Sequence, residues 1–292
     1  MSTDLAPIGR RASGDRARGA AFQAALLFSL TVGFVLLGVL LVDVLRRGIP
    51  FADGVLLGNP PSADPDRAGA RPAILGTVYM MGLLLLMAVP LGVGTAIYLE
   101  EYANRERWFT RALEVNVQNL AAVPSIVYGI LGLAFLVRGP LGLGRVLLAG
   151  AMILTLLVLP TVIVASREAI RAVPDSIRHA AYALGATRWQ VVYRQVLPAA
   201  IPGIATGSIL ALARAIGETA PLLLVGALTY VRFDPTLLGE FTALPVQIFR
   251  WISQPQEDFR QLAAAGILVL LAIMVSMNAS AIWLRNRYGR RW

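Results

Sequence analysis

Six long apolar runs divide the sequence, and they limit its fold more than any other feature. They lie at about residues 21–45, 73–99, 118–137, 146–165, 199–231 and 261–284. A membrane-spanning helix needs roughly 20 consecutive apolar residues, so each run is long enough to cross a bilayer. We therefore predict an all-α, polytopic membrane protein with six transmembrane helices. The transmembrane domain covers residues 21–284, between polar tails at residues 1–20 and 285–292.

The composition supports a membrane protein and excludes several kinds of chemistry. Apolar residues make up 57% of the chain and charged residues only 15%, which is too apolar for an ordinary soluble domain. The chain has no cysteine and a single histidine, His179, so we expect no disulfide and no metal site. All 26 basic residues are arginine, which excludes the phosphate-binding lysine of a P-loop and a Schiff-base lysine. We therefore expect neither a catalytic residue nor a cofactor in this chain.

The arginines flank the apolar runs, which is typical of membrane proteins and not of a nucleic-acid-binding patch. The polar segments that share a side of the membrane with the two termini carry 16 arginines, against 9 in the segments on the other side. By the positive-inside tendency, we predict that both termini and the loop at residues 166–198 are cytoplasmic. The first apolar run is too long for a signal peptide, so we expect an uncleaved first helix.

A polar stretch at residues 166–202 predicts two short helices around Gly185. Asp175 or Ser176 can cap the first helix, and Gly185 can end it in the left-handed conformation that glycine adopts at little cost. Thr187 and Gln190 have the spacing of a capping box at the start of the second helix. The stretch therefore reads as helix, glycine turn and helix between two membrane spans.

Each of the two short helices has a single apolar stripe with helical spacing. The stripes consist of Ile177, Ala180, Ala181 and Leu184 on the first helix, and of Trp189, Val192, Tyr193 and Val196 on the second. We expect Pro198 and Pro202 to mark the end of the second helix. Helices this short are marginal alone in water, so they need a surface to pack on. Either they pack against the ends of this chain's own membrane helices, or they form a coupling element that another protein holds.

Arg214 and Glu218 lie inside the fifth apolar run, where a charged side chain costs at least about 2.5–3.5 kcal/mol on insertion scales. Because they are four residues apart, they lie on the same side of a helix. Pro221 has no N–H for the carbonyl of Gly217, so we expect a kink there. Broken helices with polar side chains are typical of transport paths. We take Arg214, Gly217, Glu218 and Thr219 as candidate residues of a substrate path, and the alternative is an ion pair that only joins neighbouring helices.

The polar loop resembles the cytoplasmic signature loop of bacterial ABC importer permeases. The match consists of two adjacent alanines, a glycine after three further residues, and Leu197 with Pro198. In that family the loop forms coupling helices that fit in a cleft of the ATPase subunit. The resemblance implies contact with an ATPase by His179, Ala180, Ala181, Leu184, Gly185 and Ala186. The match is incomplete at His179, where the family usually has glutamate, and at Gln195, where it usually has isoleucine.

Longer stretches are similar to the paired permeases of phosphate ABC importers, namely NLAAVPSIVYGILG, RAVPDSIRHAAYALGATRWQVVYRQVLPAAIPGI and LARAIGET. GVGTAIYLEEYA, GETAPLLLVGA and ALPVQIF resemble the A subunit of that pair (PstA). The resemblance implies an ABC importer permease of the type I-like fold in the bacterial plasma (inner) membrane, forming half of a channel for ATP-driven inward transport of inorganic phosphate. It implies four partners: a second permease subunit of the C type, two ATPase subunits that use ATP and Mg²⁺, and an extracytoplasmic phosphate-binding protein.

Other functions fit the residues less well but stay open. Within the same family, the anion could be another oxyanion such as molybdate or sulfate. A proton-coupled secondary transporter would use Glu218 as a proton relay, but it would have no need of an exposed helix–glycine–helix loop. A third alternative is a membrane sensor or scaffold without transport of its own. In the favoured interpretation this chain is not an enzyme, because ATP is hydrolysed by a separate subunit.

Overall fold

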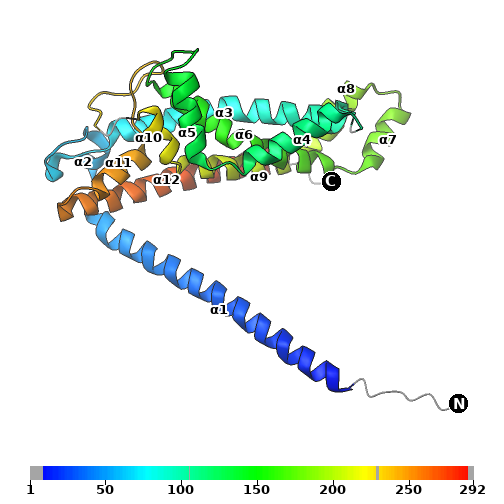
Figure 1. The fold of residues 1–292 in the computed structure, drawn as a ribbon, viewed down its shortest axis with the longest axis horizontal. Helices are drawn as coiled ribbons and strands as arrows, with labels where there is room; N and C mark the ends of the chain where they lie inside the picture. The colour runs from blue at the N-terminus through cyan, green and yellow to red at the C-terminus, as the bar shows by residue number, and fades with distance from the viewer. Residues whose placement is uncertain (1–8, 105, 228–229, 289–292) are drawn as a thin grey trace.

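The computed structural model describes residues 9–104, 106–227 and 230–288, and these residues form helices and loops with no β-strand among them. Four helices run along the long axis of the molecule (Figure 1): α3 (Arg71–Ile97), α6 (Leu147–Arg171), α9 (Leu197–Ile216) and α12 (Glu257–Tyr288). α6 is the central helix, because it packs against both α3 and α9 and most of its residues are buried. The predicted all-α fold is confirmed.

Short helices mark the two ends of this bundle (Figure 1). At one end, α7 (Asp175–Ala183) and α8 (Arg188–Val191) connect α6 to α9, and we call it the α7 end. At the opposite end lie α2 (Gly54–Gly58) and α11 (Leu244–Ile252), and we call it the α11 end. α1 (Gly9–Gly48) runs toward the α11 end and α12 runs away from it, so the start of α1 and the end of α12 lie on the same side.

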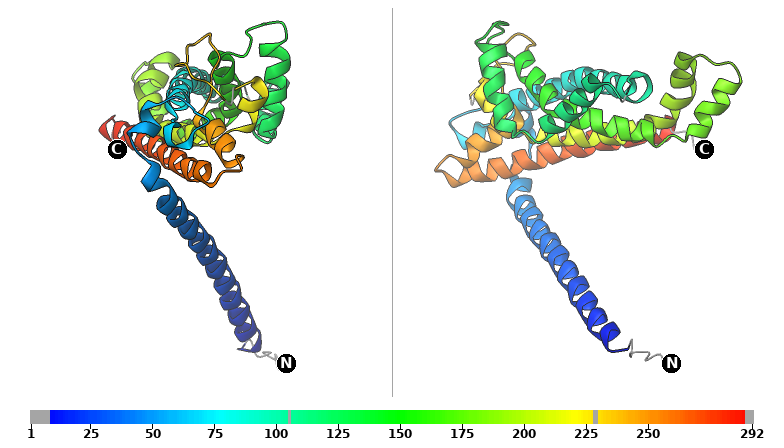
Figure 2. Two further views of the ribbon diagram at one scale, coloured as in Figure 1. Left: turned by 90° about the vertical axis from the view of Figure 1, so that its left-hand side faces the viewer. Right: turned by 45° about the vertical axis from the view of Figure 1, so that its right-hand side comes forward.

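α1 leaves the bundle at an angle, as the two further views also show (Figure 2). It packs on α12 near its own C-terminal end, where a Cβ on Gly48 would lie 2.8 Å from the carbonyl carbon of Ala264. The apolar side chains between Phe22 and Val42 are largely exposed. Such a helix needs lipid or another membrane helix around it. Two short 3₁₀ turns, η1 (Ile49–Phe51) and η2 (Pro65–Arg67), lie in the connection between α1 and α3.

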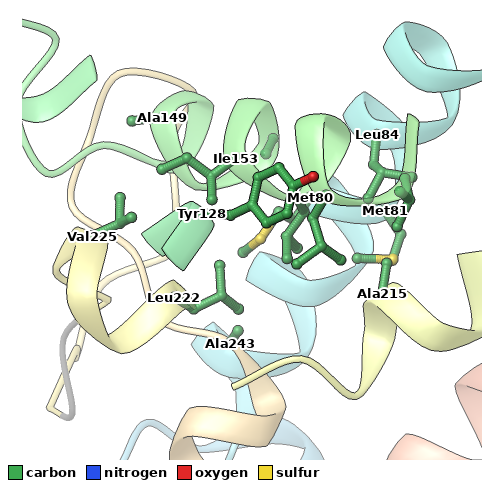
Figure 3. Packing of buried hydrophobic residues seen from close by; sticks show 14 of the residues in the cluster. Met80, Met81, Leu84, Tyr128, Ala149, Ile153, Ala215, Leu222, Val225 and Ala243 are labelled. Atoms are coloured by element: carbon green, nitrogen blue, oxygen red, sulfur yellow. The ribbon is translucent and has the colours of Figure 1, made fainter. Parts of the chain in front are cut away.

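The largest buried cluster is built from helices that are far apart in the sequence (Figure 3). Its labelled members include Met80, Met81 and Leu84 of α3, Tyr128 of α5 (Ser125–Gly132), Ile153 of α6, and Leu222 and Val225 of α10 (Ala220–Val225). A second cluster surrounds Trp251 at the α11 end, and a third surrounds Ile170 and Val196 at the α7 end. The long helices are therefore held together at both ends and between them.

Five helices of the described chain are long and apolar enough to cross a membrane, and a bent pair of helices can form a sixth crossing. The five extend over Arg18–Phe51, Arg71–Tyr102, Leu147–Arg171, Arg188–Ile216 and Glu257–Arg287. Several of them continue into the polar residues that flank the predicted runs; α3, for example, continues through the π-turn η3 (Tyr98–Tyr102). The stretch between α6 and α8 is consequently shorter than the loop predicted at residues 166–198.

The prediction of a single helix at residues 118–137 is wrong. These residues belong to α4 (Trp108–Ala121) and α5, which form the bent pair and meet at 103°. Pro124 is the N-cap residue of α5, and its ring disfavours a helical conformation for the residue before it, so α4 cannot continue. The Tyr128 hydroxyl donates to the carbonyl of Leu120 at 2.8 Å, which also accepts from the N–H of Val123 at 3.2 Å, so this side chain ties α5 to the end of α4.

The fifth run differs from its predicted bounds of 199–231 at both ends. The helix begins already at Arg188, and Pro198 and Pro202 lie inside it instead of ending it. A π-turn, η5 (Val192–Val196), ends two residues before Pro198, and its wider hydrogen-bond ring accommodates a residue that has no N–H. At the other end, α9 stops at Ile216, and only the six residues of α10 follow before the chain becomes irregular.

Candidate substrate path and coupling surface

The break between α9 and α10 is the first feature of the candidate substrate path. Gly217 is the C-cap of α9, its N–H donates to the carbonyl of Arg214 at 3.2 Å, and the N–H of Glu218 donates to Ala215 at the same distance. Pro221 lies in the first turn of α10, where its missing N–H costs nothing. The kink predicted here is therefore a complete interruption of the helix, because a new helix starts where the old one could have continued.

Arg214 and Glu218 form the ion pair that their spacing predicts, with 3.6 Å between Nε of Arg214 and Oε1 of Glu218. The Arg214 side chain is 57% exposed within this chain, whereas Glu218 is 17% exposed. Among the described residues, neither side chain pairs with a charged group on another helix. The pair therefore does not join neighbouring helices of this chain, and the guanidinium of Arg214 is available on an open face of α9.

The other two predicted path residues lie in the same break. Gly217 is exposed, and Thr219 is half-buried with its hydroxyl donating to the carbonyl of Gly217 at 3.4 Å. Thr206 and Leu210 precede Arg214 at intervals of four residues and are also exposed. They extend the open face of α9 toward the α7 end. The structure thus brings all four predicted residues together at one point of the fold.

No prediction from the sequence included the contact that joins the two broken passes. α5 and α10 pack side by side, and a Cβ on Gly129 of α5 would lie 2.7 Å from Cα of Pro221 in α10. Three residues later, Gly132 makes room for the side chain of Ile153 in α6, with the side chain of Val225 in α10 beside it, before α5 continues as the π-turn η4 (Leu133–Val137). Two glycines on one side of a helix are the sequence signal of such a close approach.

The turn between α7 and α8 agrees with its prediction. Gly185 has φ +80°, in the left-handed region, and no atom lies within 4 Å of the Cβ position there. Thr187 and Gln190 form both hydrogen bonds of the capping box. The predicted cap of the first helix is wrong, because α7 begins after Pro174 and neither Asp175 nor Ser176 caps it. Asp175 instead accepts a hydrogen bond from Arg178 at 3.1 Å.

The residues expected to contact an ATPase lie on the outer side of α7 and the turn after it. His179, Ala180, Leu184 and Gly185 are exposed, and the exposed fraction of Leu184 reaches 89%. Ala181 and Ala186 are partly buried and pack on the cluster at the α7 end. We call the four exposed residues the α7 surface. The apolar stripe of the second helix is divided, because Val192 and Val196 are buried.

The remaining two side chains of that stripe face outward. Trp189 and Tyr193 are exposed and stack on each other, with their ring centroids 5.9 Å apart and an interplanar angle of 11°. Large exposed aromatic side chains at the end of a membrane helix suit a membrane–water interface or a protein contact. The two short helices therefore pack on their own membrane helices on one side, as one of the two alternatives predicts, and present a free surface on the other. A coupling contact with another protein at that surface stays a prediction.

Buried ion pairs connect the helices beneath the α7 surface. Arg167 of α6 contacts Glu100 at 2.8 Å and also pairs with Glu114 of α4, and Arg171 contacts the same Oε1 atom of Glu100 at 2.8 Å. Arg178 of α7 pairs with Glu101 at 2.9 Å. No prediction included these residues, although two adjacent glutamates and a series of arginines, all in segments assigned to one side of the membrane, were a signal.

Cationic side chains also gather at the α11 end. Arg71 pairs with Asp234 at 2.7 Å, which joins the start of α3 to the loop after α10. The guanidinium of Arg250 lies 4.6 Å from the ring centroid of Tyr230, and that of Arg232 lies 5.9 Å from it. Burial lowers the pKa of the Arg250 guanidinium from its ordinary value, but arginine keeps its charge at neutral pH. Within the described residues, no group of three His, Cys, Asp or Glu side chains could hold a metal ion.

Helices long and apolar enough to cross a membrane, with an arginine exposed where one of them breaks, are the features of a polytopic membrane protein. Residues 88–291 match the family described as binding-protein-dependent transport system inner membrane component. The chain is 36% identical to the phosphate transport system permease protein PstA 1 of Mycobacterium tuberculosis (strain CDC 1551 / Oshkosh), over 76% of this chain and 72% of the relative. It is 34% identical to the corresponding PstA of Yersinia pestis, over 89% and 85%.

A solved structure shows the same fold at low sequence identity. The crystal structure of a bacterial alginate ABC transporter, in complex with a periplasmic protein that carries an alginate pentasaccharide, contains a chain with a TM-score of 0.67 and 17% identity. The match covers 95% of this chain and 98% of that one. The protein therefore belongs to the family of binding-protein-dependent transport system inner membrane components, and within it to the PstA permeases. It is a permease component of an ABC importer.

Proposed function

We propose that this chain is one of two permease subunits through which an ABC importer moves inorganic phosphate into the cell. The observation that carries the proposal is the position of Arg214. It lies at the end of α9, beside the break. No other helix of the described chain supplies a charged partner for it. The relatives named phosphate transport permeases support phosphate as the anion.

An arginine is suited to this position because an anion loses favourable hydration when it leaves water. Phosphate is singly or doubly charged near neutral pH, and it cannot leave water unless hydrogen-bond donors and positive charge replace the water. A guanidinium offers several planar N–H donors and does not lose its proton. Glu218 then competes with phosphate for Arg214. This competition keeps the guanidinium paired when the path is empty and keeps phosphate from being held too tightly.

The driving force must come from outside this chain, since the sequence has no nucleotide-binding motif. We assign the α7 surface as the contact with an ATPase subunit, because it combines exposed Leu184 with a left-handed glycine turn at one end of the bundle. The partners are then two ATPase subunits at the α7 end, a C-type permease beside the open faces of α1 and α9, and a phosphate-binding protein at the α11 end. The arginine asymmetry supports a cytoplasmic α7 end with both termini on that side.

The decisive experiment is transport by the purified complex in liposomes. The permease pair and the ATPase subunits are reconstituted, with ATP on the α7 side and the binding protein with labelled phosphate on the other side. We expect uptake that requires both ATP and the binding protein. Uptake that follows a proton gradient without ATP would support a secondary transporter. Uptake of molybdate or sulfate in place of phosphate would reassign the anion, and binding without uptake would support a sensor.

A further inference from the structure

Arg178 connects α7 to two membrane helices through its guanidinium alone. Nε and Nη2 donate to Oε1 of Glu101 at 3.1 and 2.9 Å, and Nη2 also donates to the carbonyl of Ile170 at 2.9 Å. Nη1 donates to the carbonyl of Val173 and, at 3.1 Å, to Oδ1 of Asp175. A guanidinium has five N–H donors, so this set of bonds uses all of them.

The acceptors belong to different elements. Glu101 lies in η3, the π-turn that continues α3, while Ile170 is in the last turn of α6 and Val173 follows it. The last carbonyls of a helix have no partner within the helix, so Arg178 caps α6 while it pairs with the end of α3. We call Arg178, Glu101 and the two carbonyls the Arg178 clamp. It joins one short helix to two long ones.

The clamp is hidden from solvent, unlike the outer side of the same helix. The side chain of Arg178 is 14% exposed and that of Glu101 is 7% exposed, whereas His179 and Leu184 on α7 are exposed. Ile177 and Ala181 also face inward, but their apolar contacts have no directional preference and allow sliding. The planar guanidinium has a fixed donor geometry, so α7 cannot rotate on α3 and α6 without breaking hydrogen bonds.

α6 is positioned to carry a displacement onward to the candidate substrate path. It lies against α9 so closely that a Cβ on Gly203 would be 2.7 Å from Cβ of Ala169, and Gly207 approaches Ala165 in the same way. α9 ends at the break beside Arg214. A continuous set of close contacts therefore leads from α7 through the Arg178 clamp and α6 to the break.

We propose that Arg178 is a positioning residue that makes α7 move as one unit with the adjoining ends of α3 and α6. When a partner displaces the α7 surface, the ends of α3 and α6 then move with it, because α7 does not rotate on them. This inference rests on the proposed function, because it takes an ATPase subunit as the source of the displacement. It adds to that function a residue that itself touches neither phosphate nor, being buried, the partner.

The first test measures the number of phosphate ions moved per ATP hydrolysed. Glu101→Leu with Arg178→Leu removes both buried charges together, which is often tolerated, and Arg178→Lys keeps the charge but loses most of the donors. Arg171→Leu is the matched control, because the ion pairs of Arg171 go to Glu100 and Glu168 and not to a described residue of α7, and Glu100 keeps Arg167. We expect the ratio to fall about tenfold in the double variant, less in Arg178→Lys, and not at all in the control.

A purely structural role would lower the amount of assembled complex but not the ratio for each complex that assembles. If the double variant does not assemble, Arg178→Lys still tests the proposal, because an unchanged ratio in that variant would contradict it. A normal ratio in an assembled double variant would overturn the role of Arg178 while wild-type uptake still supports the proposed function. No ATP-driven uptake by the wild-type complex would instead contradict the proposed function.

A distance measurement tests the same inference without phosphate. The chain has no cysteine, so a pair of spin labels can be placed in one molecule at Ser176→Cys on α7 and Asn104→Cys after η3, both exposed positions. In the wild-type background and in Arg171→Leu, we expect the distance between the two labels to be the same with and without a trapped ATP analogue. In the double variant we expect it to change on trapping. A wild-type distance that changes as much as that of the double variant would show that the clamp does not hold α7.

Discussion

Gly129 of α5 and Pro221 of α10 form a close backbone contact between the two broken passes of this permease. Each residue comes from a short helix that follows a break, α5 after the bend at Pro124 and α10 after the break at Gly217. Because Gly129 has no side chain, the backbones of α5 and α10 approach so closely that even a methyl group would lie 2.7 Å from Cα of Pro221. The position of the break beside Arg214 therefore depends on a glycine on a different helix.

Gly129→Ala should destabilise the protein by about 1–3 kcal/mol, because the added methyl group meets backbone that can yield only if α5 and α10 separate. The midpoint of thermal unfolding of the purified protein in detergent measures the change. Gly82→Ala is the control, since Gly82 lies inside α3 with open space at its Cβ position. There the same substitution should be neutral or stabilise by roughly 0.5–1 kcal/mol. Equal midpoints for the two variants would contradict the close contact.

The six apolar runs predicted helices long and apolar enough to cross a membrane, of which the described chain has five, or six with the bent pair, but they did not predict the shapes of these helices. A run of apolar residues records only that a segment avoids water, and both straight and broken helices satisfy that condition. At Pro124 the residue type signalled a break, but the direction of α5 depends on its contact with α10. At Pro198 the residue type predicted the end of a helix, but the helix continues past it, because a π-turn precedes it. Tertiary contacts decide such cases, and a single sequence does not contain them.

For the candidate site, most local signals were reliable, although the cap predicted at Asp175 or Ser176 was wrong, and distant contacts were not predicted. The ion pair between Arg214 and Glu218, and the capping box at Thr187, depend on neighbours in the sequence, and both are present. Glu101 and Arg178 are far apart in the sequence, and neither residue type shows its partner. The roles of the path residues and of the α7 surface stay predictions, which the following experiments test.

Gly185→Val should reduce ATP-driven uptake while the protein still assembles. At φ +80° any side chain with a Cβ strains the turn by about 1 kcal/mol or more, and the orientation of α7 relative to α8 must change. Gly144→Val is the matched control, because Gly144 has φ +77° and an equally open Cβ position but lies in the connection between η4 and α6, remote from the α7 surface. Uptake assays on both variants should separate general strain from strain at the coupling turn.

If the two valine variants lose uptake to the same extent, the turn at Gly185 has no special role. If Gly185→Val supports normal uptake, the α7 surface is not the contact that couples ATP hydrolysis to transport. The expected pattern is a low rate of uptake for Gly185→Val and a nearly normal rate for Gly144→Val. ATP hydrolysis by the same complexes shows whether the ATPase subunits are still bound.

Single cysteines should show which end of the bundle faces the cytoplasm. Ala63→Cys and Thr236→Cys, both exposed toward the α11 end, should react with a membrane-impermeant thiol reagent added to intact cells. Ser176→Cys on α7 should react only after the membrane is opened. Thr242 looks equally suitable in the sequence, but the structure buries it completely, so it cannot report on topology. Labelling of Ser176→Cys from outside would reverse the predicted orientation.

The last prediction separates two roles of the ion pair at the α9 break. Replacing Arg214 alone leaves Glu218, which is 17% exposed, without its partner, so a single variant can fail through instability as well as through loss of function. Replacing both residues with leucine removes the charges together, and such replacements are often neutral or stabilising. Because Arg214 is more than half exposed within this chain, we expect the double variant to assemble with its partner subunits.

Arg47→Leu with Asp43→Leu is the matched control, since these residues form an ion pair with the same spacing on α1, at 2.9 Å, with both side chains about half exposed. If Arg214 and Glu218 serve the substrate path, their double variant assembles and moves no phosphate, while the control keeps its uptake. If the pair only stabilises the assembly, both double variants that assemble are active. A path without Arg214 would have no guanidinium at the break where phosphate loses water, so normal uptake by that variant would remove both residues from the candidate path.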